Sequence, residues 1–191
     1  PNDTLTMAPG VIIKTLPEIP DRPSFNPYNY RTFDVEGMLI AEGTETEPIV
    51  FTSYRDHSAG GNTNAITDTT SASTRDWGEV ILDDGSNSST GITQHSRLGH
   101  LEMRYSSRGL RIQNGNQTFS DVLNDIKISD TYNENMNLNY GKYTVEGAVL
   151  ERSEKGGGIR SNYDGDIIVR TSQIRDHGSF GLFAEGRNNS F

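Results

Sequence analysis

The sequence predicts an all-β solenoid, a parallel β-helix, rather than a globular domain with a wide core. Three observations predict it: strand-length apolar runs recur along the chain, helical periodicity is almost absent, and the apolar content is low. Only 32% of the 191 residues are hydrophobic, against roughly 45–50% in an ordinary globular domain. Gly, Ser, Thr, Asn and Asp replace them, and these residues form turns and short polar loops. Many turns indicate many short strands.

Two interleaved series of strand-length runs give the repeat. The first series opens at intervals of 25, 22 and 19 residues, and the second at intervals of 49 and 23, so that its first interval holds about two periods. A period of roughly 19–25 residues is typical of a solenoid, because each coil adds one rung to parallel sheets. The first series begins at Leu101, Ile126, Ala148 and Ile167, and the second at Gly109, Gly158 and Gly181.

Two stretches interrupt the strand pattern. Residues 15–30 carry four prolines and are predicted to form an excursion outside the ladder, since proline cannot donate a hydrogen bond to it. Residues 53–76 are rich in Ser, Thr, Asn and Gly and are predicted to form a long surface loop. Such loops often carry function, but a tolerated insertion without a function is an equally good interpretation of this one. Trp77, where the loop rejoins the ladder, is expected to plug the loop base or the core.

Charge and composition exclude several classes of partner. The net charge of −9 and the pI near 4.9 disfavour binding to a nucleic-acid backbone or an anionic membrane. No run approaches the roughly 20 apolar residues of a membrane span, so no membrane insertion is expected. The chain has no cysteine, which excludes a disulfide framework and a thiolate metal site.

The first third of the chain resembles the β-helix repeat regions of bacterial and archaeal secreted or cell-surface proteins. Leu5-Thr6-Met7, then Pro9-Gly10-Val11 and Lys14, are similar to the entry strand of these proteins. The pattern continues in residues 37–44, residues 48–53 and Asp76-Trp77-Gly78. The resemblance implies a right-handed parallel β-helix with the pectin-lyase-like fold, located outside the cell or on its surface. It also implies an adhesive or scaffold-like part of a longer protein.

The chain departs from this pattern in two places. Glu79 stands where a second glycine is usual, and residues 62–64 keep only part of an Asp/Asn-rich loop. The fold expectation is unaffected by either departure. The second one weakens the transfer of a calcium-binding role to the loop.

Related β-helices include polysaccharide lyases and hydrolases, so paired carboxylates were sought. Asp83-Asp84-Gly85 and Asp176-His177-Gly178 resemble two motifs of the pectin hydrolases, which lie on neighbouring coils in that family. Here 93 residues, or about four coils, separate Asp83 from Asp176. At about 4.8 Å per rung the carboxylates would lie roughly 19 Å apart, far beyond the 6.5–9.5 Å of an inverting pair. The spacing therefore favours a protein that is not an enzyme.

Two acidic pairs are candidate calcium ligands, namely Asp164 with Asp166, and Asp83 with Asp84. Asp166 and Arg170 also lie at alternate positions, which share one side of a strand. Calcium prefers six to eight oxygen ligands, so two carboxylates form an incomplete set, and a solvated turn is the competing interpretation. Calcium is the only cofactor considered, because the four histidines share no zinc-ligand spacing.

Tyrosines are the candidate carbohydrate-binding residues. Tyr140, Tyr143 and Tyr163 recur in the second half of the chain, and Tyr105 and Tyr132 precede them. If several of these rings pointed outward from one sheet, they would form a surface on which sugars stack.

The sequence thus predicts a single right-handed parallel β-helix domain over residues 1–191, with roughly six or seven coils. The function expected first is a structural or adhesive module that packs against copies of itself, as in a filament, or against neighbouring domains of a longer chain. Exposed edges at both ends would need such a cover. The alternative is a carbohydrate-binding or carbohydrate-active β-helix acting on an extracellular polysaccharide. It predicts a groove with carboxylates beside Arg or Lys, or an aromatic row, on one sheet. Ice binding, a third hypothesis, requires regular threonine ranks that the sequence lacks.

Overall fold

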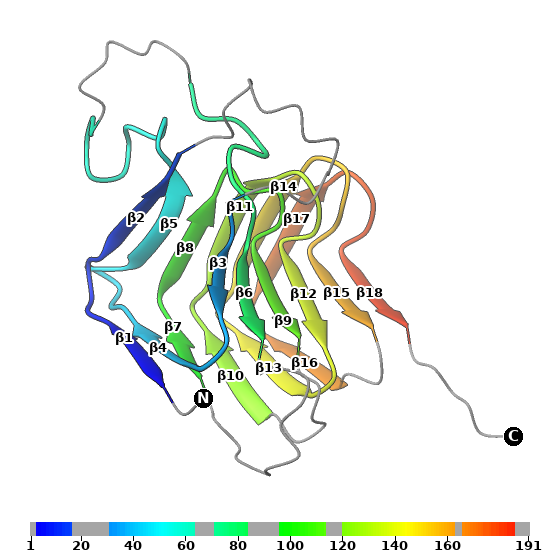
Figure 1. The fold of residues 1–191 in the computed structure, drawn as a ribbon. Helices are drawn as coiled ribbons and strands as arrows, with labels where there is room; N and C mark the ends of the chain where they lie inside the picture. The colour runs from blue at the N-terminus through cyan, green and yellow to red at the C-terminus, as the bar shows by residue number, and fades with distance from the viewer. Residues whose placement is uncertain are drawn as a thin grey trace, which may run out of the picture.

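The computed structural model describes residues 3–16, 31–63, 71–83, 96–113, 120–162 and 166–185. Over these residues the chain forms eighteen strands and no helix, and the strands build three parallel six-stranded sheets. Each coil gives one strand to each sheet in the same order, so the described chain makes six coils (Figure 1). The prediction of a right-handed parallel β-helix is confirmed.

The three sheets take every third strand of the chain. Sheet A contains β1 (Thr4–Met7), β4 (Met38–Glu42), β7 (Arg97–Gly99), β10 (Ser120–Asn124), β13 (Lys142–Glu146) and β16 (Asp166–Arg170). Sheet B contains β2 (Ile12–Thr15), β5 (Ile49–Ser53), β8 (Leu101–Arg104), β11 (Lys127–Thr131), β14 (Val149–Ser153) and β17 (Gln173–His177). Sheet C contains β3 (Phe33–Val35), β6 (Val80–Asp83), β9 (Leu110–Gln113), β12 (Met136–Asn139), β15 (Ile159–Asn162) and β18 (Leu182–Glu185).

The core is a narrow column of stacked inward side chains. In sheet C, Val80, Leu110, Met136 and Ile159 occupy one register position in four successive rungs, and each is at most 1% exposed. Alternate residues of each strand point inward, so a single coil buries two or three apolar side chains per sheet only by stacking on its neighbours. This architecture explains how 32% hydrophobic residues suffice.

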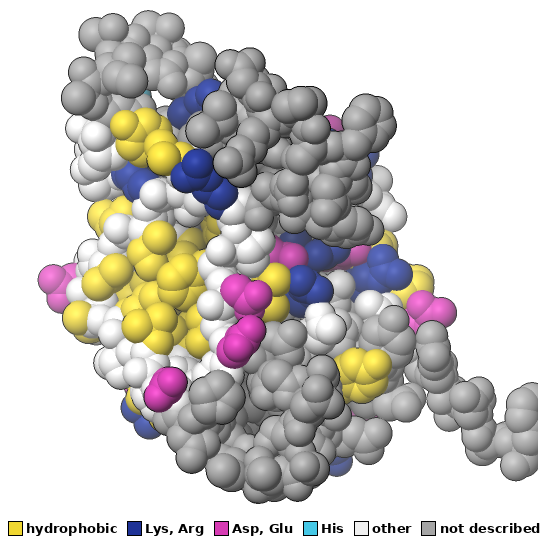
Figure 2. Space-filling view, in the orientation of Figure 1, with side chains coloured by type: hydrophobic (Ala, Val, Ile, Leu, Met, Phe, Trp, Pro, Cys, Tyr) yellow, Lys and Arg dark blue, Asp and Glu magenta, His cyan; other side chains and the backbone are white. Residues whose placement is uncertain are grey.

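Some inward positions that are buried in the middle coils are exposed in the first coil, although Met7 and Val35 of that coil stay buried. Leu5 is 43% exposed, although its register partner Leu39 in the second coil is fully buried. Figure 2 shows hydrophobic side chains gathered at this end of the solenoid. At positions such as that of Leu5, burial therefore depends on a rung on both sides.

One of the predicted strand series was partly wrong. The runs at Leu101, Ile126 and Ala148 lie in sheet B, but the run at Ile167 lies in β16 of sheet A. Sheet B continues instead at β17, where Gln173 pairs in register with Val149. The second series is confirmed, since the runs at Gly109, Gly158 and Gly181 lead into strands of sheet C.

The predicted loop 53–76 is anchored to the coils in its described parts, residues 54–63 and 71–76. Asp56, Ala59 and Asp76 are buried, and Asp56 accepts a hydrogen bond of 2.7 Å from the Thr52 hydroxyl. The base of the loop is thus part of the packed structure and not only a surface feature. Of the proline-rich excursion, residues 17–30 lie outside the described residues.

Trp77 fills the base of the loop, as predicted. Its side chain is 1% exposed, and its indole Nε1 donates a hydrogen bond of 2.8 Å to the carbonyl oxygen of Arg104. Trp77 also pairs with Ser106 of the next rung in an isolated parallel bridge. The ring therefore couples the loop to the third coil.

A search of the described residues finds no helix that is long and apolar enough to cross a membrane.

Candidate functional site

The strands of sheet B share an irregularity that shapes their outer face. In β11, Ile128 and Thr131 are both fully buried, whereas Ser129 and Asp130 between them are partly exposed. Two consecutive residues therefore face outward, and because β11 keeps a constant register with β8 and β14, the strands bend together without a β-bulge. Asp130 has the positive φ of 55° that produces the bend.

The same left-handed bend recurs in the neighbouring coils. Tyr105, next to β8, has φ of 63°, and Arg152 in β14 has φ of 52°. Their preceding residues pair in register across the three rungs, so Tyr105, Asp130 and Arg152 form one stacked row. Left-handed backbone is unfavourable for Tyr and Arg and commonly marks a functional or strained site. The repeated bend adds a row of outward side chains to sheet B.

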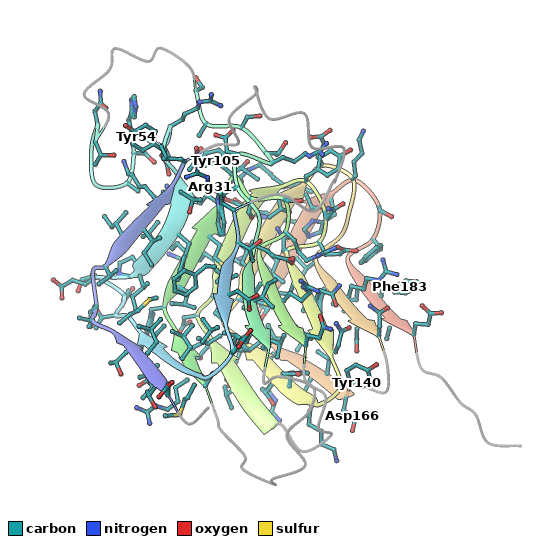
Figure 3. The ribbon with its side chains drawn as sticks, in the orientation of Figure 1. Arg31, Tyr54, Tyr105, Tyr140, Asp166 and Phe183 are labelled. Carbon is teal, nitrogen blue, oxygen red and sulfur yellow. The ribbon has the colours of Figure 1, made fainter. Side chains whose placement is uncertain are left out.

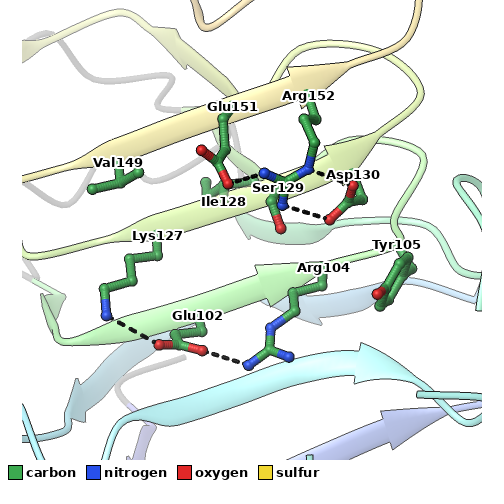
Figure 4. Close-up of a pocket in the computed structure, with 10 residues that line it drawn as sticks. All are labelled: Glu102, Arg104, Tyr105, Lys127, Ile128, Ser129, Asp130, Val149, Glu151 and Arg152. Atoms are coloured by element: carbon green, nitrogen blue, oxygen red, sulfur yellow. Dashed lines mark hydrogen bonds and ion pairs between the residues drawn. The ribbon is translucent and has the colours of Figure 1, made fainter. Parts of the chain in front are cut away.

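This row closes one side of a groove of about 280 Å³ on the outer face of sheet B (Figure 4). The groove crosses β8, β11 and β14, and its lining is dominated by charged side chains. The lining residues are Glu102, Arg104, Tyr105, Lys127, Ile128, Ser129, Asp130, Val149, Glu151 and Arg152.

Glu102 is the centre of the first cluster of charges. Its carboxylate accepts hydrogen bonds of 2.6 Å from Arg104 Nη2 and 3.3 Å from Lys127 Nζ. Burial alone would raise the pKa of Glu102, but the hydrogen bonds and positive charges of Arg104 and Lys127 outweigh it and lower the pKa. Glu102 is therefore ionised at neutral pH.

Arg104 is held from the loop as well as from the sheet. Its Nη1 donates a hydrogen bond of 3.0 Å to Ser58 Oγ and lies 3.4 Å from Asp56 Oδ2. The pKa of Asp56 is lowered although burial opposes this, because hydrogen bonds from Ser58 and Thr52 and the charge of Arg104 prevail. The anchored base of the loop thus fixes the guanidinium at the edge of the groove.

The second cluster joins β11 and β14. Arg152 donates to both oxygens of Asp130, at 2.8 and 3.0 Å, and also to Glu151. Glu151 is bound from the other side by Arg175 Nη2 at 2.6 Å. Burial opposes ionisation of Asp130, but its hydrogen bonds, that of Arg152 first, lower its pKa, and the pKa of Arg152 is raised by the hydrogen bond to Asp130 above all. Both groups are charged at neutral pH.

The arrangement suits binding rather than proton transfer. Glu102 and Asp130 both have lowered pKa values, whereas a glycosidase needs a carboxylic acid whose pKa is raised. Three carboxylates and three cationic groups face the groove, so it is close to neutral and rich in fixed donors and acceptors. Burial, followed by the charges of Asp56 and Asp130, raises the pKa of Tyr105, so its phenol stays protonated and can donate.

Acid is expected to destabilise the fold through these carboxylates. The folded-state pKa values of Asp56, Glu102 and Asp130 lie below the unfolded values of about 4. Their stabilisation is therefore complete above about pH 4–5 and is lost as the pH falls through the lowered folded-state values. Urea midpoints measured from pH 7 to pH 2.5 should fall below pH 5. The decline should be shallower for Glu102→Gln than for the wild type.

Glu154→Gln is the matched control for this titration, because the Glu154 carboxylate is 47% exposed and its ion-pair partner Lys155 is 63% exposed. We expect its decline to parallel the wild type. Midpoints that stay constant down to pH 3 would contradict the assignment of ionised, paired carboxylates.

Of the candidate calcium ligands, Asp166 lies apart from this groove. Asp166 begins β16 on the outer face of sheet A, where its carboxylate is 75% exposed and lies 3.7 Å from Lys142 Nζ. Asp164 and Asp84 lie outside the described residues, and Asp83 is described only as the last residue of β6. Within the described part of the chain, no group of three or more Asp, Glu, His or Cys residues is arranged to hold a metal ion.

The predicted tyrosine row is not one surface in the described part of the chain. Tyr143 is 1% exposed, and its hydroxyl donates a hydrogen bond of 2.9 Å to the carbonyl oxygen of Asn139, so its ring belongs to the core. Tyr140 lies near Asp166, at the opposite end of the strands from Tyr105 (Figure 3). Tyr163 lies outside the described residues. Among the described tyrosines of this set, Tyr105 is the one that lines the groove.

Apart from Tyr105, the groove residues were not singled out by the sequence, although a signal existed. Charged residues alternate with the apolar residues of the first strand series, as Glu102 does with Leu101 and Met103. When those runs are stacked at their 25- and 22-residue offsets, Lys127 lies directly between Glu102 and Val149, as it does in the structure. The left-handed bends that complete the groove have no such signal.

Comparison with known proteins adds no functional assignment. The sequence matches no family model, and neither the curated proteins nor the solved structures contain a match to it. Function is therefore inferred from the geometry of the groove and from the fold.

Proposed function

We propose that this protein is a non-catalytic adhesive β-helix module that binds an extracellular polysaccharide in the groove of sheet B. The observation that carries the proposal is the charged groove across β8, β11 and β14. A groove with carboxylates beside Arg and Lys on one sheet is what the carbohydrate hypothesis requires. The module is adhesive in the sense that it holds a glycan without altering it.

The chemistry of the groove fits the hydroxyl groups of a sugar chain. Each sugar hydroxyl can donate to a carboxylate and accept from a cationic group, and both kinds alternate in the groove. Hydrogen bonds to charged partners are stronger than neutral ones and fix orientation. The ion pairs Glu102–Arg104 and Asp130–Arg152 hold these groups in place before a ligand arrives, which lowers the entropic cost of binding.

The fold gives the site a repeat suited to a polymer. Successive rungs lie about 4.8 Å apart, which is comparable to the length of one sugar unit, and the groove crosses three rungs. A linear chain running along the solenoid axis would meet a different polar side chain on each rung, as in the column Arg104, Ser129 and Glu151, with Tyr105 available for stacking at the edge. A near-neutral lining favours an uncharged chain over a strongly anionic one, since the whole protein carries a net charge of −9.

Lys127→Ala provides the direct test of this proposal. Lys127 is 61% exposed, so its removal should leave folding intact, whereas losing a charged hydrogen-bond donor should weaken polysaccharide binding by about 10- to 100-fold. Binding is measured by isothermal titration calorimetry with neutral polysaccharides selected on a glycan array.

The matched control is Lys155→Ala, whose side chain is 63% exposed and pairs with Glu154 outside the groove. It should bind as the wild type does. The proposal fails if the wild type binds no member of the glycan panel, or if both lysine variants weaken binding equally. Shortening of the polysaccharide on incubation would instead identify an enzyme.

A further inference from the structure

The outer face of sheet A carries exposed aliphatic side chains at one register position. Val122 in β10, Thr144 in β13 and Ile168 in β16 pair in register, and Val122 and Ile168 are 56% and 50% exposed. These three side chains form a stripe in which Val122 and Ile168 lie two rungs apart with Thr144 between them. Exposed aliphatic side chains on a sheet face favour association. This stripe is separate from the groove, which lies on sheet B.

Charges flank the stripe in an ordered pattern. β13 begins with Lys142 and ends with Glu146 at its outward positions, whereas β16 begins with Asp166 and ends with Arg170. Each strand therefore carries opposite charges at its two ends, and the order reverses in the next coil. Within the chain, Lys142 Nζ lies 3.7 Å from Asp166 Oδ2.

We propose that two copies of this chain pack side by side through the outer faces of sheet A, with their solenoid axes parallel. The two copies are related by a two-fold axis that runs along the solenoid direction. Under this symmetry each coil faces the same coil of the other copy, and the facing strands run in opposite directions. A closed two-fold pair uses the same surface on both copies.

This arrangement matches every charge at the margins of β13 and β16. Because the facing strands are antiparallel, the first outward position of a strand meets the last outward position of its counterpart. Lys142 then faces Glu146 of the partner subunit, and Asp166 faces Arg170 of the partner subunit. Val122, Thr144 and Ile168 each face their own copy across the axis, so the stripe is covered by an identical stripe. The charges fix the register, and the aliphatic residues supply the buried area.

The third coil is compatible with the same packing. Arg97 occupies the stripe position of β7 and would face its own copy, but its Nε donates 3.1 Å to Glu42 of the same chain. The ion pair supplies a compensating negative charge beside each guanidinium. The adjacent Ile40 extends the aliphatic stripe into the second coil.

A two-fold axis that runs along the strands would also bring unlike charges face to face, since Lys142 would then face Asp166 of the partner subunit. That packing places β13 over β16 and overlaps only these two coils of the described chain. The parallel arrangement overlaps all coils and buries the whole stripe, so it is the one proposed. The two arrangements differ in what Thr144 meets, which is its own copy in the first and Ile168 in the second.

The first experiment measures association by sedimentation velocity over a range of protein concentrations. The wild type should form a dimer, and Ile168→Glu should weaken it at least about tenfold, because it places two carboxylates face to face. Phe183→Glu is the matched control: Phe183 is 40% exposed on sheet C, and this variant should dimerise normally. A wild-type protein that stays monomeric, or equal weakening by both variants, would overturn the proposal.

The second experiment reverses all four marginal charges, combining Lys142→Glu, Asp166→Lys, Glu146→Lys and Arg170→Glu. Every pair within and between copies is then restored with opposite sign, so this variant should dimerise with itself but not mix with the wild type. Free mixing would show that the charges do not face each other.

A third measurement distinguishes the two symmetries. The chain contains no cysteine, so Val122→Cys introduces a unique thiol. In the parallel arrangement residue 122 faces its own copy at about 10 Å, the separation of packed sheets. In the other arrangement the two copies of residue 122 are also offset by three rungs, about 14 Å, along the solenoid axis. A bis-maleimide that spans about 10 Å should therefore crosslink this variant into dimers only in the parallel arrangement. Absence of the crosslink in a sample that sediments as a dimer would reject the parallel arrangement. None of these results depends on polysaccharide binding.

Discussion

Trp77→Ala is expected to lower the free energy of unfolding by about 3–5 kcal/mol, the usual cost of truncating a large buried aromatic side chain. Trp77 is 1% exposed and is part of the continuous apolar column. Its indole also satisfies the Arg104 carbonyl, which would lose a partner in the variant. Urea unfolding followed by far-ultraviolet circular dichroism measures the change, since Trp77 is the only tryptophan and the variant lacks its fluorescence.

Trp77→Phe separates packing from hydrogen bonding at this site. Phenylalanine retains most of the apolar volume but cannot donate to the Arg104 carbonyl, so we expect a smaller loss of about 1–3 kcal/mol. Because Arg104 stands at the edge of the groove, Trp77→Ala should also weaken polysaccharide binding, whereas Trp77→Phe should preserve most of it. A loss of stability below about 1 kcal/mol for Trp77→Ala would mean that the base of the loop lies outside the cooperative core.

The repeat was predictable because two of the three sheets keep clear alternation. In β8, Leu101 and Met103 point inward and Glu102 points outward, and the glycines before β9, β15 and β18 mark the strands of sheet C. Alternation of this kind follows directly from strand geometry. The sequence therefore predicted the solenoid, its approximate period and the burial of Trp77.

Sheet A was not predicted as a separate series of strands, because strands such as β7 and β13 contain few apolar residues. β7 contains only Leu98 between Arg97 and Gly99, and β13 places its inward Tyr143 and Val145 among charged and polar residues. The run at Ile167, with three consecutive apolar residues, looked like the strongest continuation of the sheet B series. Sheet assignment depends on which runs stack, and composition within one run does not contain that information.

The groove was not predictable for a different physical reason. It forms where Tyr105, Asp130 and Arg152 all adopt left-handed backbone, and of these three types only Asp is commonly found there. The sequence pointed instead to Asp164 and Asp166 as a candidate site, because these two acidic residues lie close together in the chain. The groove carboxylates come from three coils, so only the register of the rungs brings them together.

Glu134→Ala is expected to cost about 1.5–3 kcal/mol, because Arg160 loses its carboxylate partner and Arg108 keeps only Glu79 in a partly buried ion-pair network on sheet C. The Glu134 side chain is 8% exposed and accepts from Arg108 Nε at 3.0 Å and Arg160 Nη1 at 3.1 Å. Burial opposes ionisation of Glu134, but its backbone hydrogen bond and Arg108 lower its pKa, so it is charged at neutral pH. Thermal and urea unfolding at pH 7 measure the loss.

Lys155→Ala tests whether burial, rather than ion pairing alone, sets this cost. Lys155 and its partner Glu154 are 63% and 47% exposed, so removing this pair should change the free energy of unfolding by less than about 1 kcal/mol. Glu134 also differs in joining separate coils, since Arg108 precedes β9, Arg160 lies in β15 and Arg108 reaches back to Glu79 at 2.9 Å. If both variants lost the same stability, the network would act only as a set of surface pairs. A larger loss for Glu134→Ala means that the charges outside the sheet bind the coils together as the apolar column does inside it.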